Sequence, residues 1–232
     1  MSMKRKNSFD SDKIIPSKKT NNAEIIRIVP KNEEDVIYLN EDKTSWVKLK
    51  KIKSNDNDRF GLTMNEFEDL WKQKPDKKLQ IKIAGKLIDC PRYSKSYLQP
   101  YKFSGLDHEA DMNLPERIQQ LLEYCKKNLN PFLNQSLVNW YEPDGSIGKH
   151  SDDTKQLRPD SEIFSFSFGP ATRTFILEPK KKDLNSKIYH IKLEHNIFII
   201  MGGKCQQTHY HSVPKVNNDF NRRLNVTFRC FK

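Results

Sequence analysis

Hydrophobic and polar residues alternate with a two-residue period from Pro131 to the end of the chain, which is typical of β-strands. The segments that follow this pattern are 137–141, 163–168, 174–177, 187–193, 197–201 and 223–230. Glycine and proline separate them, as at Gly145, Gly169-Pro170 and Gly202-Gly203. Many short strands with turns between them predict a sandwich or a jelly-roll barrel.

Helical periodicity appears earlier in the chain. Thr63 is a typical N-cap and Pro75 a typical stop, and the apolar residues between them are Phe67, Leu70 and Trp71. A second helix has Pro115 in its first turn and an apolar stripe of Ile118, Leu121, Leu122 and Cys125. Residues 24–52 alternate short apolar stretches with charge, which indicates strands or an irregular entry to the domain. The expected fold class is therefore mainly β with packing helices (α+β).

Residues 1–24 contain too few large apolar side chains to offset the entropy of ordering, so we expect a disordered basic tail. Lys4-Arg5-Lys6 and Lys18-Lys19 have the spacing of a two-part nuclear import signal. A tail that only raises solubility explains the same residues equally well. Nuclear localisation stays a hypothesis on this evidence.

Composition narrows the class of protein. With 232 residues, 35% of them hydrophobic, the chain can bury one sizeable core. The longest apolar run, Ile197 to Met201, is too short to cross a bilayer, and no secretory signal begins the chain. The four cysteines form no Cys-x-x-Cys pair, so neither a disulfide framework nor a thiolate zinc site is indicated. We expect a soluble, intracellular monomer with reduced thiols and no membrane partner.

A formal net charge of +11 favours a polyanionic partner such as nucleic acid. Lysine greatly outnumbers arginine, however, and a bias in the coding sequence explains a lysine excess without any partner. Charge alone therefore does not decide between the two explanations.

Metal-ligand chemistry is suggested by His150-Ser151-Asp152, because residues two apart on a strand point to the same side. His211, just ahead of the last strand, supplies a third candidate ligand. Two histidines and one carboxylate leave one face of an octahedral ion open, which is the ligand set of non-heme iron(II) oxygenases.

The last strand places polar side chains where a core would be. Its alternation sets Arg223, Asn225, Thr227 and Arg229 on one side and Leu224, Val226, Phe228 and Cys230 on the other. In a barrel the two guanidiniums would be buried and would need an anion. Their Cα atoms would lie about 20 Å apart, so they could hold opposite ends of a small dicarboxylate. A surface strand with solvated arginines is the alternative.

Asn139 and Tyr141 share a face of the strand that precedes the metal motif. An amide and a phenol are natural hydrogen-bond partners for a carboxylate held by arginine. A polar pair between neighbouring strands is the alternative interpretation.

Taken together, Asn139-Trp140-Tyr141, His150-x-Asp152, His211 and the Arg-x-Asn-x-Thr-x-Arg motif from Arg223 to Arg229 resemble the AlkB family of oxidative nucleic-acid dealkylases. The resemblance continues upstream through Pro91-Arg92-Tyr93 and Tyr101-Lys102-Phe103-Ser104-Gly105, and so covers about residues 80–232. Within the family the chain is most similar to the eukaryotic branch that repairs double-stranded DNA.

The resemblance implies a double-stranded β-helix (jelly roll) with Fe(II) at one mouth, and with 2-oxoglutarate and O2 as cosubstrates. The dioxygenase domain would cover 80–232, with a nucleotide-recognition lid over about 80–110, and residues 25–79 would be an extension packed on the core. Arg223 and Tyr141 would bind the distal carboxylate of 2-oxoglutarate. Arg229, Asn225 and Asn139 would serve the end near the metal.

For the substrate, the resemblance implies N-alkylated bases such as 1-methyladenine or 3-methylcytosine in DNA or RNA, demethylated as 2-oxoglutarate is converted to succinate and CO2. Tyr101 and Phe103, followed by Ser104, would contact the flipped nucleotide, although both aromatics also suit an ordinary core. Asp153 would lie near the exocyclic group, and Arg92 would help to fix the lid.

The chain differs at one position from the branch that repairs double-stranded DNA, and this difference bears on whether its substrate is single- or double-stranded. Ala84 stands where that branch has a bulky aromatic, and a methyl group cannot wedge into a base stack. Single-stranded DNA or RNA is therefore a substrate candidate beside duplex DNA. A protein hydroxylase with the same metal chemistry and a nucleic-acid-binding module without turnover are the alternative functions.

Overall fold

The computed structural model describes residues 23–53, 60–83, 85–103, 106–152, 155–181, 186–216 and 221–232. The basic clusters at Lys4 and Lys18, and the expected disorder of the tail, lie outside these ranges. So do Ala84, Ser104 and Asp153.

Two β-sheets form the body of the described chain, which confirms the expected jelly-roll class. The smaller sheet has the order β1 (Glu24–Ile28), β14 (Lys187–Leu193), β13 (Arg173–Pro179), β16 (His209–Val213), β11 (Ile147–His150). The larger has the order β2 (Asp35–Tyr38), β3 (Ser45–Lys51), β15 (Ile197–Gly203), β12 (Ile163–Phe168), β17 (Arg223–Arg229), β10 (Gln135–Tyr141), β6 (Tyr93–Tyr97), β9 (Ala110–Asp111). Apolar side chains of both sheets, such as Leu49, Ile199 and Leu177, share one buried cluster between them.

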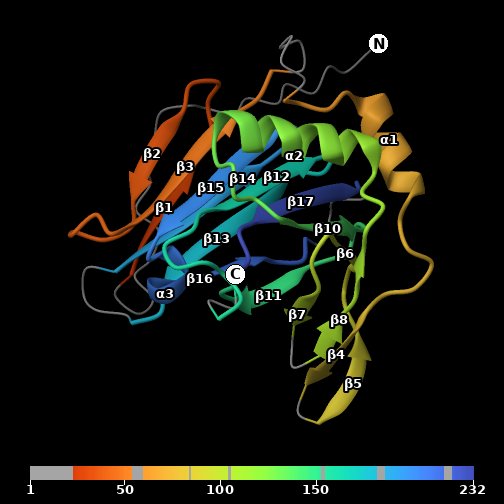
Figure 1. Cartoon of the computed structure of the whole chain (residues 1–232). Coiled ribbons are helices and arrows are strands. Elements are labelled where there is room, and N and C mark those ends of the chain that lie inside the picture. Colours follow the sequence, from red (N-terminus) through yellow and green to blue (C-terminus); the bar gives the residue numbers. More distant parts are fainter. Residues whose placement is uncertain are drawn as a thin grey trace, which may run out of the picture.

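Helices cover the other face of the larger sheet (Figure 1). These are α1 (Met64–Lys72) and α2 (Glu116–Asn128), and both confirm the predicted packing helices. Thr63 caps α1 through a capping box with Glu66, and Pro115 is the N-cap of α2. Because the larger sheet is covered on both faces, every residue of β17 is buried. A third, short helix, α3 (Cys205–Thr208), precedes β16.

Residues 24–51 form strands of both sheets. β1 pairs with β14 in parallel, and β3 pairs with β15 along seven residues. The short apolar stretches of this region therefore complete the sandwich. Within the described residues, no helix is long and apolar enough to cross a membrane.

Two β-hairpins lie between α1 and α2 in the chain. β4 (Gln80–Ile83) pairs with β5 (Lys86–Asp89), and β7 (Tyr101–Phe103) pairs with β8 (Leu106–His108). In Figure 1 the β4–β5 hairpin projects away from the sandwich, on the side where β11 and β10 lie. Gly85, at its tip, has a φ of +82°, which glycine adopts without the strain of a side chain.

Candidate metal centre and cosubstrate cavity

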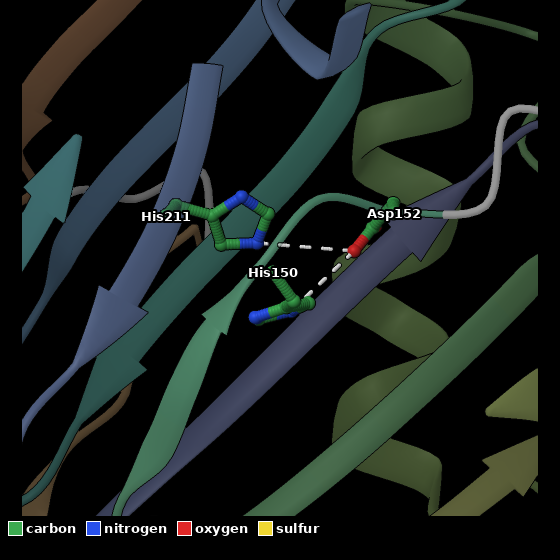
Figure 2. Close-up of side chains that lie close together, drawn as sticks. All are labelled: His150, Asp152 and His211. Atoms are coloured by element: carbon green, nitrogen blue, oxygen red, sulfur yellow. Dashed lines mark ion pairs between the residues drawn. The ribbon is translucent and has the colours of Figure 1, made fainter. Parts of the chain in front are cut away.

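The side chains of three residues from different parts of the chain lie close together (Figure 2). His150 ends β11, Asp152 follows two residues later, and β16 places His211 opposite His150 in the strand pairing. Their candidate ligand atoms all lie within 4.8 Å of one another. The structure thus brings together the three residues that the sequence analysis assigned to the metal.

The two carboxylate oxygens of Asp152 have different surroundings. Oδ2 accepts a hydrogen bond of 2.6 Å from Nε of Arg229. Oδ1 lies 3.8 Å from Nε2 of His150 and 3.8 Å from Nε2 of His211, and it is buried without a donor among the described residues. A buried carboxylate oxygen without a donor is costly unless a cation takes it, so this donor set fits a divalent metal.

The tautomer and the protonation state of the histidines suit metal ligands. Nδ1 of His150 donates to the carbonyl oxygen of Gly148 at 2.9 Å, so the lone pair of this imidazole is on Nε2, the atom that faces Asp152. The ring of His211 stacks on Phe175 with the centroids 5.5 Å apart. Burial, followed by the charge of His150, lowers the pKa of His211 to about 3, and burial also lowers the pKa of His150. Both imidazoles are therefore neutral near pH 7, which is the form that binds a metal.

The carboxylate of Asp152 stays ionised at its buried position. Burial alone would raise its pKa, but the charge of Arg229, with those that His211 and His150 carry when protonated in acid, outweighs burial and lowers the pKa to about 2. A permanent negative charge, 4% exposed, therefore stands beside two neutral imidazoles. This combination attracts a cation.

One cavity beside these three residues contains the residues expected to bind the cosubstrate. Its lining includes Asn139, Tyr141, Arg223, Asn225 and Arg229, with the three metal-site residues.

Arg223 has the features of an anion-binding side chain. Its Nε donates to Oγ of Ser167 at 2.7 Å, and its guanidinium lies 4.8 Å from the ring centroid of Tyr141. Its Nη1 is buried without an acceptor among the described residues. Since a buried guanidinium donor needs an acceptor, this position fits a carboxylate of 2-oxoglutarate.

Arg229 finds its partners within the protein. Besides Asp152, it donates from Nη1 to Oε1 of Gln135 at 3.2 Å. Arg229 thus lines the cavity beside the three metal-site residues, and its charge is paired with that of Asp152. The anion expected from the inward-facing arginines is, for Arg229, a metal-site carboxylate.

Asn139 and Asn225 belong to a network that joins β10 and β17 to β6. Oδ1 of Asn139 accepts from Arg92 at 3.0 Å and from Ser94 at 2.6 Å, while its Nδ2 donates to Asn225 at 3.4 Å. Arg92 therefore connects the region of the expected lid to the floor of the cavity.

Tyr101, expected to contact a nucleotide, and Arg92, expected to help to fix the lid, both line the cavity. The ring of Tyr101 lies 5.0 Å from the guanidinium of Arg229 and stacks on Phe231 at 6.4 Å. Phe103 belongs to β7. The side chain of Phe103, and all of Ser104 and Asp153, lie outside the described part of the chain.

Several residues of the site were not predicted from the sequence. Arg173 is 1% exposed and donates to the carbonyl oxygens of Gly145 and Pro214, so it ties together the loops beside β11 and β16. A strand prediction that began at 173 would have placed it inward, with Phe175 and Leu177. Gln206 and Lys180, which contact the segment of Asp152, carry no such local signal.

Comparison with known proteins agrees with the metal-ligand set described above. A family model described as the 2OG-Fe(II) oxygenase superfamily matches residues 82–229. Alpha-ketoglutarate-dependent dioxygenase alkB homolog 3 from Rattus norvegicus is 33% identical over 147 residues, which cover 60% of this chain and 50% of that protein. DNA oxidative demethylase ALKBH2 from Mus musculus is 33% identical over 164 residues, which cover 65% of this chain and 66% of that protein.

The chain thus spans between half and two thirds of the length of these curated relatives. A crystal structure of an oxidoreductase of the 2OG-Fe(II) oxygenase family from Burkholderia pseudomallei covers 72% of this chain and 77% of its own, with 15% identity and a TM-score of 0.47.

Proposed function

The chain belongs to the AlkB family of the 2OG-Fe(II) oxygenase superfamily, and from this premise we propose that it removes N-alkyl groups oxidatively from nucleic-acid bases. The observation that carries the proposal is one cavity that contains two buried polar atoms without hydrogen-bond partners. Oδ1 of Asp152 lacks a donor and Nη1 of Arg223 lacks an acceptor, each among the described residues. A divalent metal satisfies the first and an organic anion the second.

In this proposal His150, Asp152 and His211 hold Fe(II), and Arg223 with Tyr141 holds the far carboxylate of 2-oxoglutarate. Bound Fe(II) would supply the activation of O2: one oxygen atom would end in succinate as 2-oxoglutarate loses CO2, and the other would hydroxylate the N-alkyl carbon, which then leaves the base as an aldehyde. The protein contributes orientation and a buried cavity. Arg229 holds Asp152 through Oδ2, and Asn139 and Asn225 belong to the lining of the same cavity.

The substrate class rests on two supports. The relatives named above include a DNA oxidative demethylase, and Tyr101, an aromatic residue of the expected lid, lines the cavity next to the metal site. An aromatic ring that contacts an extruded base gains on the order of 1–3 kcal/mol, which offsets part of the cost of unstacking. The net charge of +11 favours a polyanion as well.

We further propose that single strands are better substrates than intact duplexes. Ala84, between Ile83 and Gly85 in the sequence, offers only a methyl group, and such a side chain cannot fill the gap that a flipped base leaves. A base in a single strand leaves no gap in a duplex stack, so no side chain is needed to fill one.

The test is a demethylation assay with purified protein, Fe(II), ascorbate and 2-oxoglutarate, on oligonucleotides that contain 1-methyladenine or 3-methylcytosine. We expect loss of the methyl group with equal release of succinate, and a higher kcat/KM on single strands. Asp152→Ala should abolish both. Asp76→Ala should leave both unchanged, because Asp76 is exposed and does not line the cavity.

Succinate release without loss of methyl from any oligonucleotide would disprove base dealkylation and favour a protein substrate. Equal or faster turnover of duplexes would disprove the strand preference alone. No succinate from the wild-type protein would disprove the oxygenase.

A further inference from the structure

The segment that carries Asp152 has no regular secondary structure. β11 ends at His150, and Ser151 and Asp152 follow outside any strand or helix. Asp152 is nevertheless 4% exposed, and its Oδ1 faces both histidines. A ligand on irregular backbone keeps one orientation only if neighbouring elements hold that backbone.

Gln206 holds the segment from the side of α3. Its Oε1 accepts a hydrogen bond of 2.9 Å from the backbone N–H of Asp152, and the Gln206 side chain is buried at 7% exposure. Its Nε2 lies 3.3 Å from Sδ of Met201, so the amide is fixed at both ends. A fixed amide at this N–H restrains the rotation of the Asp152 backbone, and with it the direction of the side chain.

Lys180 holds the same segment one residue earlier. Its Nζ donates to Oγ of Ser151 at 2.9 Å and to the carbonyl oxygen of Gln206 at 2.8 Å. In the part of the chain that the structure describes, no carboxylate pairs with this ammonium group. Lys180 thus donates hydrogen bonds both to the segment that carries Asp152 and to α3, which carries Gln206.

These contacts connect all three metal-site residues. α3, which contains Gln206, leads directly into β16 and His211, while Ser151 lies between His150 and Asp152. We propose that Gln206 and Lys180 are positioning residues that hold Asp152 so that its Oδ1 points at the metal. This inference rests on the proposed metal site and is independent of the substrate.

The expected effect is on metal affinity. Loss of a hydrogen-bonding partner behind a metal ligand costs roughly 10- to 100-fold in affinity. We expect a loss of this size for Gln206→Leu, which keeps the bulk of the side chain but removes the acceptor. Lys180→Met should weaken binding less, because Lys180 contacts Ser151 and the carbonyl oxygen of Gln206 and not Asp152 itself.

The experiment titrates metal-free protein with Mn(II), follows free Mn(II) by electron paramagnetic resonance, and records the visible absorption of the Co(II) form as a probe of ligand geometry. Gln207→Leu is the matched control, because Gln207 is the exposed neighbour in the same helix. Circular dichroism and the melting temperature of each variant show whether it is folded. Lys180→Met, at a more exposed position, provides the test if Gln206→Leu does not fold.

Weaker Mn(II) binding and an altered Co(II) spectrum in folded Gln206→Leu or Lys180→Met, with Gln207→Leu like the wild type, support the proposal. Wild-type affinity and spectrum in both variants overturn it. A wild-type protein that binds Mn(II) but demethylates no oligonucleotide contradicts the proposed function and leaves this inference standing.

Discussion

Arg229 and Asp152 form a buried ion pair, with Nε 2.6 Å from Oδ2, and this pairing leaves only Oδ1 of the carboxylate to face the histidines. The arginine therefore both neutralises a buried charge and selects the oxygen that is available to a metal. It also explains how a carboxylate can be held at 4% exposure in the protein before any metal binds.

Removal of the Arg229 side chain should destabilise the protein strongly. Arg229→Met leaves Asp152 as an uncompensated buried charge, and we expect a loss of about 3–5 kcal/mol in the free energy of unfolding without metal. Urea denaturation measures it. Arg222→Met is the control, because the pair of Arg222 with Glu68 is more than a third exposed and should contribute about 1 kcal/mol or less. Equal losses in the two variants would show that the buried pair is not special.

Replacement of Arg223 should affect the cosubstrate and spare the metal. Arg223→Met removes the unpartnered Nη1 from the cavity, and loss of a charged hydrogen bond of about 1.5–3 kcal/mol corresponds to a rise in the KM for 2-oxoglutarate of roughly 10- to 100-fold. Succinate release at varied 2-oxoglutarate measures it, with Mn(II) affinity as the control. An unchanged KM would assign Arg223 to structure only.

The capping box of α1 gives a prediction about acid stability. Burial acts to raise the pKa of Glu66, but hydrogen bonds from Thr63 and the charge of Arg117 outweigh it and lower the pKa below 4.5. A carboxylate with a lowered folded-state pKa stabilises above its unfolded pKa and loses that contribution as the pH falls through the folded value.

The difference in unfolding free energy between wild type and Glu66→Gln should therefore be largest above about pH 5 and shrink below pH 4. Urea denaturation between pH 3 and 7 measures it. A difference that grows toward acid pH would contradict the prediction. Thr63→Ala should cost about 0.5–2 kcal/mol at neutral pH through the loss of the N-cap.

Gly202 should tolerate no side chain. It lies opposite Trp46 in the pairing of β15 with β3, and a Cβ at this position would overlap the indole ring. Gly202→Ala should therefore displace Trp46 and cost about 1–3 kcal/mol. Trp fluorescence and thermal unfolding report both effects. Gly148→Ala, where a Cβ meets nothing within 4 Å, should change the stability by about 0.5 kcal/mol or less.

Local periodicity was sufficient to predict much of the core. The alternation over 223–230 placed Arg223 and Arg229 on one side of a strand, and the structure buries both, because side-chain direction in a strand depends only on the order of residues. The stripe at Ile118, Leu121 and Cys125 predicted the buried face of α2 for the same reason. Such patterns are local and need no knowledge of the tertiary structure.

Contacts between distant segments could not be predicted in this way. The partner of Arg229 is Asp152, 77 residues earlier in the chain, and nothing in either local pattern connects them. Gln206 and Lys180 are ordinary polar residues until the fold brings them to Asp152. The charge of Arg173 is likewise directed at backbone carbonyls, which have no signature in the sequence.

The pairing of β3 with β15 and of β1 with β14 has a practical consequence for the choice of expression boundaries. A fragment that begins at residue 80 would retain every residue that lines the cavity. It would, however, leave backbone N–H and C=O groups of β15 and β14 unpaired along two open edges, of which the β15 edge is strongly apolar. Open edges of this kind recruit strands from other molecules. Recombinant fragments should therefore begin before Glu24, since shorter ones would form aggregates through their exposed edges.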